Sequence, residues 1–178
     1  MSPNVEDANT GINEAFLEVR KRFENLKDAV IYLNHREIPS SSMRVQPILN
    51  LSFFNKNTRS YRVEVALTSK IDSKTPMNDL PHDVLVGWLA HELGHVYDYK
   101  NRSWWGMLGY GVLYVTSRRF MKKAEQRADK YAIQNGFLVD ILKTKRYMLN
   151  HIEMDEKYKR RLQKYYYSPE EIEAMAKD

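Results

Sequence analysis

The sequence predicts a mainly helical α+β domain with a small antiparallel sheet. Apolar residues recur at helical spacing near the N-terminus and again beyond residue 80, whereas residues 45–68 alternate between apolar and polar. The composition, with 43% hydrophobic and 29% charged residues, is typical of a chain that folds. Because a chain of 178 residues suits one domain with its own core, we expect a single domain over residues 1–178.

An apolar stripe runs through the N-terminal region at alternating spacings of four and three, which predicts a core-facing amphipathic helix over residues 12–34. The stripe consists of Ile12, Phe16, Val19, Phe23, Leu26, Val30 and Leu33. A break follows between Glu37 and Ser42, where Ile38-Pro39 precedes three serines.

After this break the pattern changes to a period of two, which predicts two or three antiparallel strands over residues 45–68. Tyr61, Val63 and Val65 alternate with other residues, and 55–58 has the composition of a turn. A small sheet of this kind exposes an edge strand, which can hold an extended peptide by main-chain hydrogen bonds.

A helix is predicted over residues 80–101, because Pro81 follows Asn78-Asp79-Leu80 and suits the first helical turn. Its apolar residues cover so much of its surface that we expect it to be largely buried. Polar side chains inside such a helix require an explanation.

The segment from Trp104 to Val115 is apolar throughout and too short to span a bilayer, which needs about 20 helical residues. We interpret it as a buried helix or a wall of a substrate cleft. The alternative is a peripheral membrane contact through residues 104–119. Further helices are predicted over 120–136, with Gly136 as cap, and within 140–178, where Ser168-Pro169-Glu170-Glu171 is a capping box.

Composition excludes several kinds of site. The chain has no cysteine, so any metal must be held by histidines and carboxylates.

The net charge of the chain is +5, which is modest. We interpret the clusters of basic residues as solvated helix faces, because no nucleic-acid motif accompanies them. Residues 1–10 lack the features of a signal peptide, so a cytoplasmic location is expected. The oligomeric state is not predicted.

His91-Glu92-Leu93-Gly94-His95 carries the strongest chemical signal. Residues four apart lie on one helix face, so His91 and His95 can reach a single metal ion. Glu92 is rotated by about 100° from His91, which keeps it beside the metal without making it a ligand. A carboxylate in that position can act as general base toward a metal-activated water.

A third ligand is expected downstream, because a catalytic zinc generally has three protein ligands. Asp98 and Asn101 occupy the positions where one common continuation has glycine and histidine, so that arrangement is excluded. Glu125 can complete a His₂Glu site. Asp129, one turn further on, is placed to accept a hydrogen bond from the far nitrogen of a ligand imidazole, most simply that of His91.

The pattern His91-Glu92-x-x-His95 followed by Glu125-x-x-Ala128-Asp129 resembles the gluzincin zinc metallopeptidases, in particular their small soluble relatives, the minigluzincins. The match covers Leu80 to about Gly136. The resemblance implies a zincin-like domain whose Zn²⁺ is held by His91, His95 and Glu125 beneath a small sheet, with an edge strand that borders the cleft and aligns the substrate. Unlike the membrane members of the family, this chain has no predicted transmembrane helix.

The predicted function is therefore zinc-dependent hydrolysis of peptide bonds in a peptide or protein substrate, with Glu92 as catalytic base. Candidates for a residue that stabilises the oxyanion are His151, Tyr131, Tyr147 and Arg127. The main alternative is a catalytically silent or latent zinc-containing module that binds peptides. The sequence predicts neither the substrate nor the cleavage preference.

Overall fold

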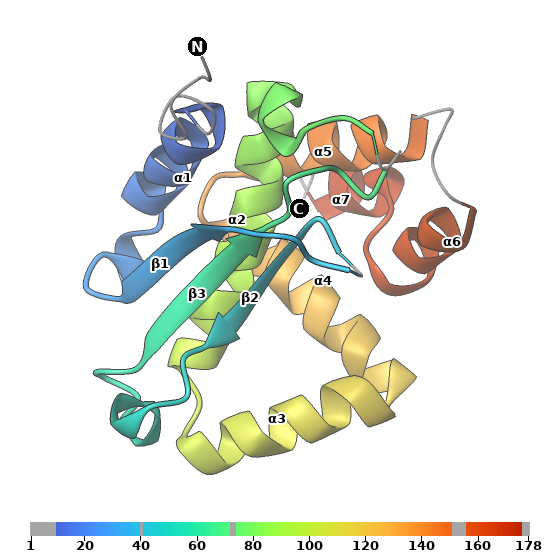
Figure 1. The fold of residues 1–178 in the computed structure, drawn as a ribbon. Helices are drawn as coiled ribbons and strands as arrows, with labels where there is room; N and C mark the ends of the chain where they lie inside the picture. The colour runs from blue at the N-terminus through green and yellow to red at the C-terminus, as the bar shows by residue number, and fades with distance from the viewer. Residues whose placement is uncertain (1–9, 40, 72–73, 151–155, 176–178) are drawn as a thin grey trace.

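A computed structural model describes residues 10–39, 41–71, 74–150 and 156–175. Helices dominate, and one small sheet lies across them (Figure 1). The helices are α1 (Thr10–Arg22), α2 (His82–Lys100), α3 (Trp104–Thr116), α4 (Arg118–Gln134), α5 (Leu138–Asn150), α6 (Glu156–Tyr165) and α7 (Pro169–Met175). The strands are β1 (Val30–His35), β2 (Met43–Pro47) and β3 (Ser60–Val65), and the short 3-10 helices are η2 (Glu24–Leu26), η3 (Leu51–Phe54) and η4 (Met77–Asp79).

The sheet is mixed rather than purely antiparallel, in the order β1-β3-β2. β2 pairs antiparallel with β3, as predicted, but β1 runs parallel to β3 with Val30 opposite Ser60. The prediction of a helix over 12–34 was wrong in its second half, since α1 ends at Arg22. Around Ile31 burial alternates, with Val30 and Tyr32 exposed, which is the period of a strand.

α2 is the central element and packs against α1, α4, α5 and β2. Its residues from Val84 to Val96 are buried without interruption. This helix corresponds to the one predicted over 80–101, and the expectation that it is largely buried is confirmed.

α3 extends across the lower end of the molecule as drawn in Figure 1. The expectation of a buried helix was wrong, since only Met107 and Tyr110 are buried in it. No helix in the described ranges combines the length and the apolar character needed to cross a membrane.

The helices predicted over 120–136 and 140–178 correspond to α4 and to α5–α7. Gly136 follows α4 with a φ of 86°, a left-handed conformation that glycine adopts without strain. The capping box at α7 is confirmed, because the Ser168 backbone N–H donates to Glu171 Oε2 at 2.8 Å and the Glu171 N–H donates to Ser168 Oγ at 3.2 Å.

Candidate metal centre

Two imidazoles from α2 form one side of the site. His91 and His95 are buried one helical turn apart, and their ring centroids are 4.8 Å from each other. A buried helix places them away from water, so both rings need partners inside the protein.

Glu125 of α4 provides the partner for both rings. Its Oε2 lies 3.1 Å from Nε2 of His91 and 3.4 Å from Nε2 of His95. One ligand atom from each of the three residues falls within 4.8 Å of the others, and all three side chains are buried. This group could hold a metal ion.

Asp129 lies behind His91, where the spacing places it. Its Oδ1 is 2.8 Å from Nδ1 of His91, and its Oδ2 accepts a bond of 2.9 Å from Lys145 Nζ. A proton held on Nδ1 by this carboxylate would leave Nε2, which faces Glu125, to bind a cation once the proton on Nε2 is lost.

The carboxylates near His91 favour its protonated form. Burial alone lowers the pKa of His91, but Asp129 and then Glu125 outweigh burial and raise it to about 10. Burial opposes ionisation of Glu125, yet His95 and His91 hold its pKa well below the ordinary value. These pKa shifts show that the site favours positive charge. A metal cation bound by the same nitrogen and oxygen atoms would replace the proton as the source of that charge.

Glu92 is buried beside the cluster but is not part of it. Burial raises the pKa of Glu92, while His91, His95 and a hydrogen bond from the Val45 backbone act in the opposite direction. The Glu92 carboxyl thus lies next to the three candidate ligands and is held by the Val45 backbone instead of by them.

A cavity of about 380 Å³ opens beside His91, His95, Glu92 and Glu125. One wall is β2 and another is the inner face of α3, including Met107 and Tyr110. The interpretation of the 104–115 segment as a cavity wall is thus confirmed. A smaller cavity of about 50 Å³, lined by apolar residues such as Trp88 and Met148, adjoins His91 and Glu92 on the other side.

β2 presents main-chain groups to this space. Ala66 N–H donates to Ser42 O, and Ile48 N–H donates to Ser60 O. In an antiparallel pair these bonds alternate along the strand, so Val45 directs its N–H and C=O away from β3. The prediction that an edge strand borders the cavity is confirmed.

No family model, curated protein or solved structure matches this chain. A function must therefore be argued from the site itself.

The described candidates for an oxyanion-stabilising residue lie elsewhere. Arg127 binds Asp98, whose carboxylate also accepts from Arg102. Tyr131 packs edge-on against Tyr97, and Tyr147 lines a separate surface pocket near Pro81 and Lys143. His151 is outside the described residues.

Three residues that the sequence did not assign to the site reach it instead. Arg161 of α6 and Tyr166 line both cavities, and the Tyr166 ring centroid is 5.4 Å from that of His91. Tyr114 of α3 donates a hydrogen bond to Oε1 of Glu125, and burial raises the Tyr114 pKa, so the hydroxyl keeps its proton. No motif marks these positions, because only the fold brings them to α2.

Proposed function

We propose that the protein is a zinc metalloendopeptidase. The observation that carries the proposal is the position of Glu92, a buried carboxyl outside the His91, His95 and Glu125 group but on the wall of the same open cavity. A metal site built only to stabilise the fold would be closed and would not need a further carboxylate beside an accessible space.

The donor set favours zinc over calcium or magnesium, which prefer all-oxygen ligands. His91, His95 and Glu125 would hold the ion, with Asp129 fixing the proton on Nδ1 of His91. When bound, zinc polarises a carbonyl and makes water a better nucleophile at neutral pH. Glu92 then takes the proton released in the attack and transfers it to the departing amine nitrogen.

The proposed substrate is an extended peptide chain. The outward C=O of Val45 can accept a hydrogen bond from its main chain, as at a sheet edge to which a strand is added, while the Val45 N–H donates to Glu92. This pairing positions a peptide bond beside Glu92, because the Val45 backbone itself contacts that carboxyl.

The test uses three variants on one helix. We expect Glu92→Gln to keep stoichiometric zinc and lose cleavage of casein and of a peptide library. His95→Ala should lose both zinc and cleavage. His82→Ala removes an exposed histidine of the same helix and should keep both. Metal analysis of protein purified without added metal gives the first readout. Cleavage by Glu92→Gln at the parental rate would show that the base is wrongly assigned.

The alternative of a latent or silent zinc-containing peptide-binding module has one observation in its favour. Arg161 and Tyr166 occupy the walls of the cavity above His91. If they obstruct the substrate, the zinc-loaded parent would bind peptides without cleaving them, and removal of either side chain would start turnover. The effect of replacing Arg161 therefore separates the two functions.

A further inference from the structure

The outer face of α3 is apolar although it faces solvent. Trp105, Leu108, Val112 and Val115 follow one another at spacings of three, four and three, which is one stripe of a helix. Trp105, Val112 and Val115 are 67%, 60% and 77% exposed. A second stripe, at Met107 and Tyr110, faces inward, so α3 is apolar on both sides.

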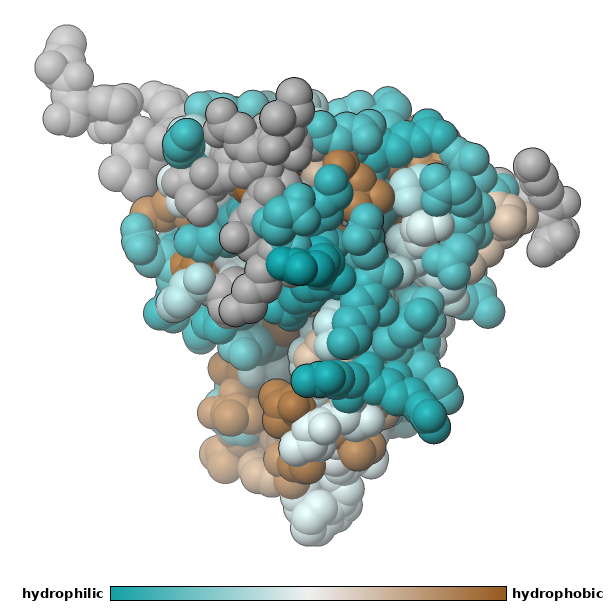
Figure 2. Space-filling view, turned by 90° about the vertical axis from the view of Figure 1, so that its right-hand side faces the viewer, coloured by the Kyte–Doolittle hydropathy of each residue, from teal (hydrophilic) through white to brown (hydrophobic). Residues whose placement is uncertain are grey.

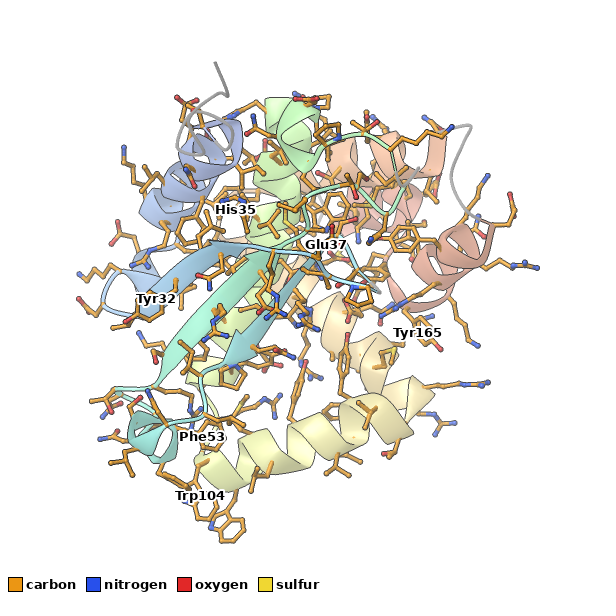
Figure 3. The ribbon with its side chains drawn as sticks, viewed as in Figure 1. Tyr32, His35, Glu37, Phe53, Trp104 and Tyr165 are labelled. Atoms are coloured by element: carbon orange, nitrogen blue, oxygen red, sulfur yellow. The ribbon has the colours of Figure 1, made fainter. Side chains whose placement is uncertain are left out.

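The apolar surface continues onto η3 beside the start of α3. Phe54 packs edge-on against Trp104 with ring centroids 5.3 Å apart, and Trp104 stacks on Trp105. Figure 3 shows Phe53 and Trp104 at this corner of the molecule. Leu51, at the start of η3, is 92% exposed. In Figure 2 the hydrophobic residues gather at the lower end of the molecule, with hydrophilic side chains beside them.

A basic cluster adjoins the other end of α3. Arg118, Arg119, Lys122 and Lys123 lie on the first two turns of α4 and reach solvent, whereas Glu125 is buried. They form no ion pair with any carboxylate in the described part of the chain. From Arg102 to Lys123 the sequence contains no aspartate or glutamate. The exposed stripe therefore lies beside uncompensated positive charge.

We propose that this surface, the outer stripe of α3 with η3 and the basic cluster of α4, docks on a lipid bilayer that contains anionic phospholipids. Indole and aliphatic side chains on a helix that lies in the interface insert at the boundary of headgroups and acyl chains, and nearby arginines and lysines bind the anionic headgroups. The stripe runs along α3, which extends across the lower end of the molecule (Figure 1), so a broad lipid surface can contact it along its length. Binding is peripheral, since none of the described helices can span the membrane.

The experiment is co-sedimentation of the full chain with vesicles of phosphatidylcholine alone or of phosphatidylcholine with phosphatidylglycerol at three to one. We expect the parent to pellet with the anionic vesicles, to bind the neutral vesicles at least about tenfold more weakly, and to be released as salt rises. Tryptophan emission should shift to shorter wavelength on binding.

Two double variants, each with a control, test the basic cluster and the apolar stripe separately. Lys122→Glu with Lys123→Glu should weaken binding by at least about tenfold, whereas Lys130→Glu, an exposed lysine further along α4, should change it little. Trp105→Ser with Val112→Ser should also weaken binding, whereas Val139→Ser, an exposed residue of α5, should not. Unchanged zinc content and circular dichroism establish that each variant is folded.

Three results would overturn the proposal. The first is that the parent does not bind anionic vesicles at low salt, and the second is that the α3 variants bind as well as their control. The third is that the parent binds no vesicles but forms a dimer in sedimentation velocity, and that Trp105→Ser dissociates this dimer. The last result would assign the surface to a second copy of the chain.

Discussion

At the scale of single residues, His91 is held from two sides. Asp129 accepts from one ring nitrogen and the other faces Glu125. Lys145 in turn neutralises part of the charge on Asp129 and lies over the Tyr166 ring at 4.2 Å. Because the chain Lys145, Asp129, His91 is buried throughout, the ring orientation is fixed before a cation arrives.

Arg161 is the residue whose replacement discriminates best between the proposed functions. If it stabilises negative charge on the substrate carbonyl, Arg161→Met should lower kcat by about 100-fold or more with little change in zinc content. Arg160→Met is the matched control, since Arg160 is exposed and donates to the carbonyl of Glu156 in its own helix. Steady-state kinetics on one fluorogenic peptide gives the comparison. A rise in kcat for Arg161→Met would instead favour the latent module.

The spacing in the sequence predicted two pairs of side chains, and the need for a third ligand together with the family resemblance joined them. His91 and His95 share a helix face, and Glu125 and Asp129 share another, so two local patterns define most of the cluster. Arg161, Tyr166 and Tyr114 could not be predicted in this way. Their approach to the site depends on how α3 and α6 pack, which is determined by tertiary contacts rather than by a residue pattern.

At the scale of elements, the site requires α2 and α4 to be very close. A Cβ on Gly94 would overlap the backbone carbonyl of Ala128, which lies between Glu125 and Asp129. Glycine at this position thus lets α4 bring both carboxylates to His91, and any larger side chain must push the helices apart.

We therefore expect Gly94→Ala to destabilise the protein by roughly 1–3 kcal/mol and to weaken zinc binding. Gly109→Ala is the control, because no atom lies within 4 Å of a Cβ built there. In an exposed helix interior that change should stabilise by about 0.5–1 kcal/mol and leave zinc affinity unchanged. Denaturant unfolding and chelator competition provide the two measurements. Equal zinc affinity in Gly94→Ala and the parent would contradict this account of helix packing.

Element boundaries show where a pattern in the sequence is ambiguous. Val30 and Leu33 continue the spacing of the N-terminal stripe, yet they belong to β1, because pairing with β3 completes the sheet. Because β3 is a parallel partner remote from β1 in the sequence, the residues around β1 carry no local pattern that predicts this pairing. In α3 the apolar run was visible, but the sequence could not show that only one of its faces is covered.

At the scale of the whole molecule, α3 joins the two proposals. Its inner stripe lines the larger cavity, and its outer stripe forms the proposed docking surface. Val115 contributes to both, since it lines the cavity and is also among the most exposed apolar residues. Docking through the outer stripe would place the cavity beside the bilayer, where membrane-tethered polypeptides are concentrated.

If both proposals hold, the protein loaded with zinc should cleave a peptide anchored by a lipid to anionic vesicles at least about tenfold faster than the same peptide free in solution, because both partners share one surface. Rising salt should abolish the difference without changing cleavage of the free peptide. The double variant Lys122→Glu, Lys123→Glu should have the same effect as high salt, since both lysines are exposed and belong to the basic cluster. Equal cleavage of anchored and free peptide by an enzyme that binds the vesicles would mean that docking turns the cavity away from the membrane.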